Sequence, residues 1–192
     1  MIGLDNKVKL MQAAIDLMAE KGYKGVSTKE IAAAAGVSEM TLFRNFANKL
    51  NLLEKAVEHF HYSMEMTRIF QEEVVWDMRA DLLLISEMYH KVMGRNRKLF
   101  LIVLADNDLA GIRQEAQKHP RILLELLTDY FKEMQRQHKM IDTDAETQAI
   151  TFMWMHYGAF ISSLYTAEAV TKVTREQFAE SSADLFVRAL SR

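Results

Sequence analysis

The chain has 192 residues, 49% of them hydrophobic and 26% charged, so it is long enough for one or two small globular domains with a buried core. It contains no cysteine, which excludes a disulfide framework, a thiolate metal site and a cysteine nucleophile. No apolar run reaches the ~18 residues of a membrane span, and the N-terminus lacks the apolar segment of a signal peptide. We therefore expect a cytoplasmic protein without a membrane partner.

The net charge of −2 is not typical of a protein that binds nucleic acid non-specifically. Residues 1–60 carry eight Lys/Arg against seven Asp/Glu, a net of +1, and the remaining 132 residues carry a net of −3. This asymmetry is small, so any DNA-binding function must be inferred from motifs rather than from charge.

The first predicted helix covers about residues 6–21. Val8, Met11, Ile15 and Met18 recur at the spacing of one buried helix face, and Gly22 ends the helix. We expect this helix to support its neighbours by packing against them.

Two short helices joined by a tight turn are predicted over residues 27–46. Ser27 and Glu30 have the spacing of a capping box, in which each satisfies a backbone N–H group of the other. Gly36 can adopt the left-handed conformation that ends a helix, and Ser38 can cap the next one. The sequence thus predicts a helix, a three-residue turn and a second helix.

The second of these helices has two different faces. Leu42 and Phe46 lie four residues apart and share the inner face. Eight residues make roughly 12 Å of helix, which matches the ~12 Å width of the DNA major groove. This is the geometry of a helix-turn-helix with the second helix as the reader. Its outer face carries Glu39, Met40, Phe43 and Arg44, with Thr41 and Asn45 at the borders.

The segment GYKGVSTKEIAAAAGVSEMTLFRNFANKLNLLEKAV, with the preceding MQAAIDLMAEK, resembles the N-terminal domain of TetR-type transcriptional repressors. The resemblance covers about the first third of the chain and implies a DNA-binding domain at 1–48, with a helical domain for ligand binding and dimerisation at 49–192. The residues expected at DNA are Ser27, Thr28, Ser38, Glu39, Met40, Thr41, Phe43, Arg44, Asn45 and Lys49.

Several of these residues admit more than one role. Arg44 can donate two hydrogen bonds to guanine or pair with phosphate, and Asn45 can reach adenine or pack at the groove edge. Glu39 is unfavourable near phosphate unless it accepts from cytosine N4 or faces outwards. Phe43 departs from the tyrosine usual in the family and can touch a thymine methyl, and Met40 departs from a frequent glycine.

The fourth predicted helix begins with a lysine. Asn48 is placed to cap this helix, which begins at Lys49. A cation in a first helical turn opposes the helix dipole, so Lys49 is expected to have a functional reason to be there. In the family this position contacts phosphate, and we expect the same here.

The rest of the chain is predicted to be helical, giving an all-α fold of about nine helices. Residues 99–105 are compatible with a strand, but no partner strand is evident and a buried helix is favoured. Gly94 is expected to end the long helix before them, and a Thr143–Glu146 pair and a Thr174–Gln177 pair to cap the last two. The predicted helices are 74–93, 99–105, 109–118, one from His119–Pro120, about 144–166, and about 175–190.

The 144–166 helix is apolar nearly all round, which indicates burial on all sides and, in a domain of this size, contact with a second subunit. This matches the four-helix dimer interface of the TetR family. The residues expected in a homodimer interface are Tyr157, Gly158, Ile161, Ser162, Phe178, Leu185 and Phe186. A dimer would place two reader helices about 34 Å apart on a palindromic operator.

The family commonly binds a small molecule in its C-terminal bundle. Because the sequence shows no cluster of buried charges, we expect an apolar or aromatic effector, with methionines adapting to its shape. The same residues can equally form plain core, and His156 a hydrogen-bonded core histidine. The candidate pocket residues are Met78, Met88, Met93, Phe100, Met134, Met153, Trp154 and His156.

The sequence thus predicts a repressor that a small apolar or aromatic ligand in the C-terminal domain releases from its operator, with two alternative functions. One is a helix-turn-helix dimer that binds DNA constitutively or answers to a protein partner. The other is a helical enzyme, against which the chain offers no HExxH, glycine-rich phosphate loop, G-x-S-x-G or Cys/His metal spacing. The sequence predicts no cofactor and no metal.

Overall fold

The computed structural model describes residues 5–60, 63–164 and 170–192. In these ranges the chain forms α-helices, one π-helix and one 3-10 helix, and no β-strand beyond a single bridge between Met140 and Ser191. The predicted all-α class is confirmed. None of the helices in the described ranges is both long and apolar enough to cross a membrane.

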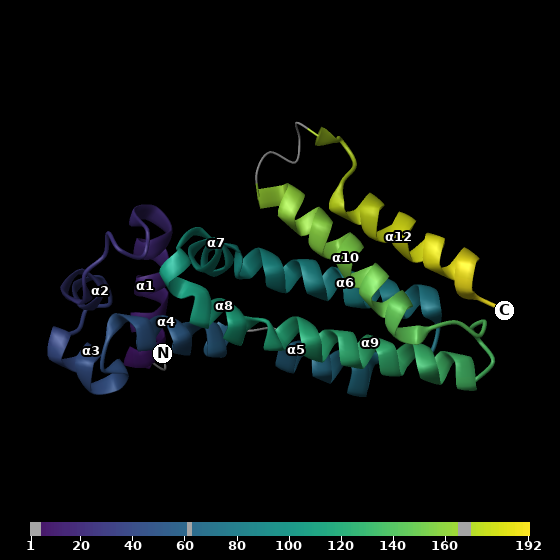
Figure 1. Cartoon of the computed structure of the whole chain (residues 1–192), viewed down its shortest axis with the longest axis horizontal. Coiled ribbons are helices and arrows are strands. Elements are labelled where there is room, and N and C mark those ends of the chain that lie inside the picture. The colour runs from purple at the N-terminus through teal and green to yellow at the C-terminus, as the bar shows by residue number, and fades with distance from the viewer. Residues whose placement is uncertain (1–4, 61–62, 165–169) are drawn as a thin grey trace. The chain divides into compact units, whose positions relative to one another are not determined.

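The chain divides into two compact units, each assembled from two segments of the sequence. The first comprises residues 1–61 and 96–118, and the second residues 62–95 and 119–192. The first unit contains α1 (Asn6–Lys21), α2 (Thr28–Ala34), α3 (Glu39–Phe46), α4 (Lys49–Phe60), α7 (Arg97–Ala105), the 3-10 helix η2 (Asn107–Leu109) and α8 (Ala110–Ala116) (Figure 1).

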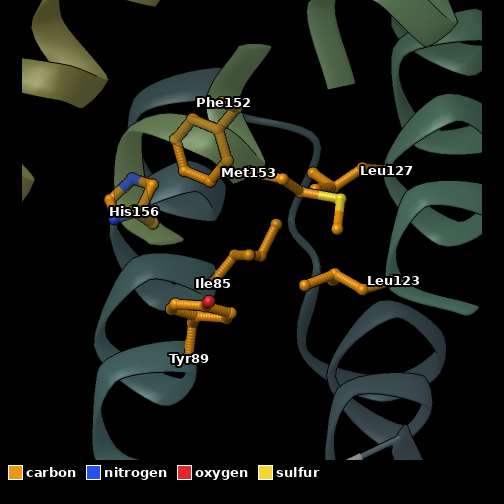
Figure 2. Close-up of a pocket in the computed structure, with 7 residues that line it drawn as sticks. All are labelled: Ile85, Tyr89, Leu123, Leu127, Phe152, Met153 and His156. Atoms are coloured by element: carbon orange, nitrogen blue, oxygen red, sulfur yellow. The ribbon is translucent and has the colours of Figure 1, made fainter. Parts of the chain in front are cut away.

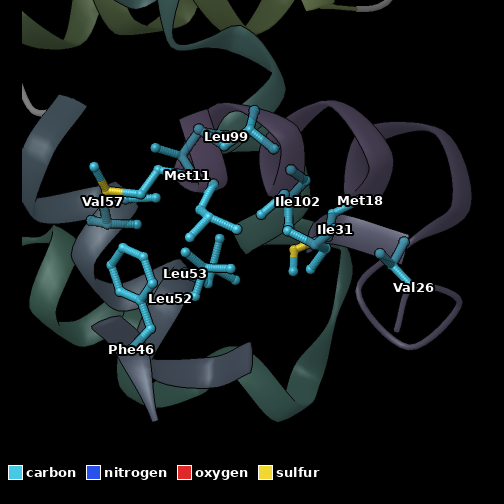
Figure 3. Close-up of a cluster of buried hydrophobic side chains, with 14 of the residues drawn as sticks. Met11, Met18, Val26, Ile31, Phe46, Leu52, Leu53, Val57, Leu99 and Ile102 are labelled. Atoms are coloured by element: carbon cyan, nitrogen blue, oxygen red, sulfur yellow. The ribbon is translucent and has the colours of Figure 1, made fainter. Parts of the chain in front are cut away.

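The core of the first unit draws on all of these elements. Leu10 of α1 and Leu42 of α3 are fully buried in one cluster. Ile31 of α2 and Leu53 of α4 are fully buried in the same cluster, and Ile102 of α7 joins them (Figure 3). At ~25 cal/mol per Å² of buried apolar area, such a cluster is the main source of stability for a small helical unit. The unit therefore extends beyond the predicted domain of residues 1–48, because α4 and α7 bury their apolar faces in it.

The second unit contains α5 (Ser63–Arg68), the π-helix η1 (Ile69–Glu73), α6 (Met78–Arg95), α9 (Lys118–Arg136), α10 (Ala145–Leu164) and α12 (Arg175–Leu190) (Figure 1). Phe131 of α9 stacks on Phe186 of α12, with ring centres 6.3 Å apart, and Phe152 of α10 meets the same Phe186 edge-on at 5.3 Å. These rings join three helices into one core.

A buried acid links α6 to α9. Asp81 is 1% exposed; its carboxylate accepts a hydrogen bond from the Tyr130 hydroxyl and another from the backbone N–H of Val75, both 2.9 Å long. Trp76, which has a positive φ of 61°, stacks on Tyr130 with ring centres 5.7 Å apart. Burial, followed by the Asp81 charge, raises the pKa of the Tyr130 hydroxyl above its ordinary value.

Some predicted helix boundaries differ from the structure. The helix expected at 74–93 is α6, which begins at Met78 because the Asp77 side chain accepts from the Ala80 N–H at 2.8 Å, and it continues through Gly94 to Arg95. The last predicted residues of the 144–166 helix lie outside the described residues. That helix begins at Ala145, where Asp144 rather than Thr143 provides the cap, accepting from the Thr147 N–H at 2.6 Å.

The middle of the chain also differs in detail. The segment expected at 109–118 is split into η2 and α8, because the Asp106 side chain accepts from the Asp108 N–H and starts a 3-10 turn. Helix α9 begins at Lys118, so Pro120 is its third residue rather than its first. The helix favoured over a strand at 99–105 is confirmed as α7, although Leu101 and Leu104 on it remain exposed.

Candidate nucleic-acid interface

The capping box that starts α2 is confirmed. The Ser27 hydroxyl accepts from the Glu30 N–H at 3.2 Å, and the Glu30 carboxylate accepts from the Ser27 N–H at 2.9 Å. Lys21 adds an ion pair to Glu30 at 2.9 Å. Lys21, followed by the Ser27 N–H and hydroxyl, lowers the pKa of Glu30 to about 2. The start of the helix-turn-helix is therefore set by local hydrogen bonds.

The turn between α2 and α3 is closed by backbone hydrogen bonds. The Val37 N–H donates to the Ala32 carbonyl at 3.0 Å and the Gly36 N–H to the Ala33 carbonyl at 3.1 Å. Gly36 has a φ of 69°, which a residue with a Cβ rarely adopts. Ser38 then caps α3 by accepting from the Thr41 N–H at 3.2 Å. The turn fixes the direction of α3 relative to α2.

One face of α3 is anchored in the first unit and the other faces solvent. Leu42 is fully buried and Phe46 is 4% exposed, as their spacing predicts. Met40 is 81% exposed and Phe43 is 47% exposed. The Arg44 side chain is exposed and, among the residues that the structure describes, has no hydrogen-bond or ion-pair partner. The outer face thus presents one cation and two apolar side chains.

The polar residues around this face are held by one another. The Thr28 hydroxyl donates to the Glu39 carboxylate at 2.7 Å, which joins α2 to α3. The Asn45 amide donates to the Thr41 carbonyl at 2.7 Å, and the Thr41 and Ser38 hydroxyls are 2.9 Å apart. The sequence indicated that these residues lie near DNA but not that they satisfy each other. Glu39 in particular has a partner within its own unit.

Lys49 has an intramolecular role that the sequence did not reveal. Its ammonium donates to the backbone carbonyls of Tyr23 and Val26, each at 2.7 Å, and lies 4.4 Å from the centre of the Tyr23 ring. Burial lowers the pKa of Lys49 below its ordinary value, and the Asp106 charge partly opposes this. Lys49 therefore clamps the loop between α1 and α2, and its third N–H has no hydrogen-bond acceptor among the residues that the structure describes.

A small cavity lies within the second unit. Its volume is about 10 Å³, roughly the room for one water molecule. Of the eight predicted pocket residues, Met153 and His156 line it, while the other five lining residues were not predicted. The wall consists of Ile85 and Tyr89 from α6, Leu123 and Leu127 from α9, and Phe152, Met153 and His156 from α10 (Figure 2).

The other predicted pocket residues lie elsewhere. Met78, Met93 and Met134 are buried away from the cavity wall, and Met88 is half-buried. Phe100 belongs to the first unit, and Trp154 is 67% exposed. Helical spacing identified apolar faces but not which of them border a cavity, because that depends on how neighbouring helices meet.

His156 is a hydrogen-bonded core histidine. Its Nδ1 lies 3.0 Å from His90 Nε2 and 3.3 Å from the Ser86 hydroxyl, and its Nε2 lies 3.4 Å from the Ser182 hydroxyl. Burial lowers the pKa of His156 to about 3 and that of His90 to about 4. Both rings are therefore neutral at physiological pH, and one of them borders the cavity.

The residues expected in a dimer interface fall into two groups. Tyr157, Gly158 and Leu185 are exposed on the protomer, and Ile161, Ser162 and Phe178 are half-buried. Phe186 is 5% exposed, so the structure places it in the core of the protomer, between Phe131 and Phe152, rather than on an open face. Trp154 adds an exposed aromatic side chain on α10 that the interface prediction had omitted.

Comparisons with known proteins agree with this geometry. Residues 10–56 match the family described as bacterial regulatory proteins, tetR family. Over 185 residues the chain is 32% identical to the HTH-type transcriptional regulator YvkB of Bacillus subtilis, and the match covers 95% of this chain and 96% of YvkB.

Two solved structures have a similar fold. NalD, the secondary repressor of the MexAB-OprM multidrug efflux pump in Pseudomonas aeruginosa, has a TM-score of 0.77 at 17% identity, over 99% of both chains. FadR from Bacillus subtilis in complex with stearoyl-CoA has a TM-score of 0.71 at 19% identity, over 94% of this chain and 97% of FadR. From the matched helix-turn-helix and the full-length relative, this chain belongs to the TetR family and is a DNA-binding transcriptional regulator, not an enzyme.

Proposed function

We propose that this regulator is a homodimeric repressor that binds a palindromic operator through α3 of each protomer. The observation that carries the proposal is the outer face of α3, where Arg44 is exposed beside Met40 and Phe43 on a helix anchored by its opposite side. A guanidinium in this position can donate two hydrogen bonds to guanine O6 and N7.

The surroundings of α3 supply the proposed phosphate contacts. Lys49 keeps one N–H beyond its two carbonyl bonds, and Ser27 and Thr28 lie at the start of α2, where backbone N–H groups favour an anion. Ser38 and Thr41 are placed similarly at the start of α3. Such contacts set the register of the protein on DNA, whereas the outer face of α3 selects the sequence.

The proposed dimer uses the last two helices of each protomer. Tyr157 and Trp154 on α10 and Leu185 on α12 are exposed, and Gly158 leaves room for close approach of another helix. Burying such a face in a second protomer would remove large apolar side chains from water. The same symmetry would present two reader helices about one DNA turn, or ~34 Å, apart.

The proposed signal is a small apolar or aromatic molecule bound in the second unit. FadR, whose fold is similar, is seen with stearoyl-CoA, a molecule with a long apolar chain. The cavity of about 10 Å³ is far below the ~300 Å³ or more of a typical ligand pocket, so such a molecule would occupy this cavity only in a more open state. In the proposal, this open state binds DNA less tightly. By linkage, a ligand that prefers the open state weakens DNA binding by the same factor by which DNA weakens binding of the ligand.

A regulator without a small-molecule ligand is the second candidate, and the small volume of the cavity favours it. Thermal shift against a panel of apolar and aromatic compounds distinguishes the two. Under the ligand model, a compound that raises the melting temperature also weakens operator binding. Full operator affinity at saturating concentrations of every stabilising compound would support constitutive or partner-controlled DNA binding.

Selection of bound sequences from a random double-stranded DNA pool, at about 150 mM salt, tests the DNA-binding part. We expect an enriched palindrome, and we expect Arg44→Ala to lose a preference within each half-site without losing stability. If no sequence is enriched, the selection is repeated after unfolding and refolding to remove any bound inducer. Failure after that step would contradict the proposed function.

A further inference from the structure

Apart from Arg44, the polar side chains of α3 and of its N-cap Ser38 are poorly placed to read bases, because each is bonded to another group of the protein. Glu39 accepts from Thr28 at 2.7 Å, and the Ser38 and Thr41 hydroxyls are 2.9 Å apart. Asn45 directs its amide nitrogen to the Thr41 carbonyl at 2.7 Å, whereas bidentate reading of adenine uses that nitrogen together with the amide oxygen. Each of these bonds orients its side chain towards another group of the protein, so these groups are less free to turn towards a base than a side chain without such a bond.

Three side chains of α3 remain for contacts with the bases: Met40, Phe43 and Arg44. Their spacing of three and four residues puts them on one face of the helix. Met40 is 81% and Phe43 47% exposed, so most of the Met40 side chain and about half of the Phe43 side chain face solvent. An isolated exposed apolar residue is ordinary, but here two of them lie beside Arg44, whose side chain has no partner in the described part of the chain, and together they form a surface of defined chemistry.

The chemistry of the major groove limits what this surface can recognise. The base edges there are hydrogen-bond donors and acceptors, except for the C5 methyl group of thymine. An apolar side chain pressed against a donor or acceptor removes its water without replacing the hydrogen bond, which is unfavourable. Met40 and Phe43 therefore favour thymine and disfavour the other base edges. Specificity then comes both from the attraction to thymine and from the penalty against the other bases.

The spacing of the three residues sets the expected pattern. Met40 and Arg44 are separated by about 6 Å along the helix axis, at 1.5 Å per residue. Base pairs follow one another at about 3.4 Å, so a helix lying along the groove places these two side chains roughly two base steps apart. Met40, which contacts a thymine methyl group, and Arg44, which binds guanine, therefore face base pairs about two steps apart.

We propose that this regulator reads each operator half-site through the methyl groups of thymines contacted by Met40 and Phe43, within about two base pairs of a guanine bound by Arg44. The inference rests on the proposed function, since it needs α3 to enter the major groove. It adds which bases are read and by which non-polar contacts.

Deoxyuridine is the direct probe, because it pairs with adenine as thymine does and lacks only the methyl group. Each thymine of the selected operator is replaced singly by deoxyuridine, and Kd is measured at fixed salt for the natural protein and for the Met40→Ala and Phe43→Ala variants. Leu104→Ala is the matched control, since Leu104 is 48% exposed in the same unit but on α7. Circular dichroism checks that every variant is folded.

We expect a single deoxyuridine at either of two positions of a half-site to raise Kd about fourfold. The same replacement in both half-sites should raise Kd about 15-fold. Both values follow from the usual free-energy gain on burying a methyl group. Phe43→Ala should abolish the effect at one position and Met40→Ala at the other, as in a double-mutant cycle. Leu104→Ala should keep both effects.

Two results would overturn thymine reading while leaving the proposed function intact. One is tight binding of the operator with less than about a 1.5-fold change for every deoxyuridine replacement. The other is a deoxyuridine effect that persists unchanged in both the Met40 and the Phe43 variants. If the natural protein selects no operator at all, the proposed function fails, and the thymine reading fails with it.

Discussion

Replacing Lys49 with methionine tests whether the ammonium at the start of α4 holds the loop between α1 and α2. Its two hydrogen bonds, to the Tyr23 and Val26 carbonyls, are each 2.7 Å long, and Val26 is 2% exposed in the core. The loop is tight, because a Cβ at Gly25 would lie 2.3 Å from the Lys21 carbonyl oxygen. Methionine keeps the length of the side chain and removes the donors.

The magnitude follows from these contacts. Each hydrogen bond from a charged donor contributes about 1.5 kcal/mol at the low end, and the Tyr23 ring adds about 0.5 kcal/mol. Burial of the ammonium, which also lowers its pKa, offsets part of this gain. We therefore expect Lys49→Met to lower the free energy of unfolding by about 2.5 kcal/mol, or the melting temperature by about 5 to 10 °C for a chain of this size.

Thermal unfolding followed by far-UV circular dichroism measures the effect, with Lys29→Met as the control. Lys29 is exposed on α2 and, within the described part of the chain, forms no ion pair, so its removal changes the net charge equally. If the two variants melt within about 1 °C of each other, the clamp contributes no stability and the reasoning fails.

DNA binding by the same variant separates structure from recognition. Loss of one phosphate contact per protomer lowers the slope of log affinity against log salt by about 1 per contact. We expect this change when Lys49→Met is assayed well below its melting temperature. An unchanged slope would assign Lys49 to the loop alone.

Three further predictions concern the second unit. Tyr130→Phe removes the hydrogen-bond donor to the buried Asp81 carboxylate and should lower the free energy of unfolding, measured in urea, by about 1.5 to 3 kcal/mol. A decrease below about 0.5 kcal/mol would contradict this role. Burial lowers the pKa of His90 to about 4 and of His156 to about 3, so below pH 6.5 the unfolded chain takes up protons that the folded one does not. Stability should therefore be full above pH 6.5 and fall towards pH 4 by up to about 1.4 kcal/mol per unit for each histidine, a slope that His90→Gln should reduce. Leu185→Glu, at a position 56% exposed on α12, should convert the proposed dimer to a folded monomer in sedimentation experiments, and a persisting dimer would place the interface elsewhere.

The sequence predicted those features that depend on neighbouring residues. The Ser27–Glu30 and Thr174–Gln177 capping boxes are both present, and Leu42 and Phe46 anchor α3 as their spacing indicated. Caps and helical faces are set within a few residues, so their signals survive in a single sequence. The prediction that Thr143 caps α10 is wrong, because the carboxylate of Asp144, one residue later, accepts the hydrogen bond at the start of this helix.

Features that depend on distant residues were not predicted. Lys49 bonds to carbonyls 26 and 23 residues earlier, and backbone carbonyls carry no mark in the sequence. Phe186 has the apolar character expected of a dimer interface, yet Phe131 and Phe152 enclose it within the protomer. For the same reason, helical periodicity did not show that Ile85 and Leu123 border the cavity.

The discontinuous composition of the first unit has a consequence for synthesis on the ribosome. The cluster that supports α1 to α4 includes Leu99, Ile102 and Ile112, which follow the helix-turn-helix by more than fifty residues. A nascent chain that ends at residue 61 therefore holds the reader helix but lacks part of the apolar cluster on which α1 to α4 pack. At about 5–20 residues per second, this exposed interval lasts about 3 to 11 s, until residue 118 has been added. A fragment cut after α4 would remain permanently in that incomplete state.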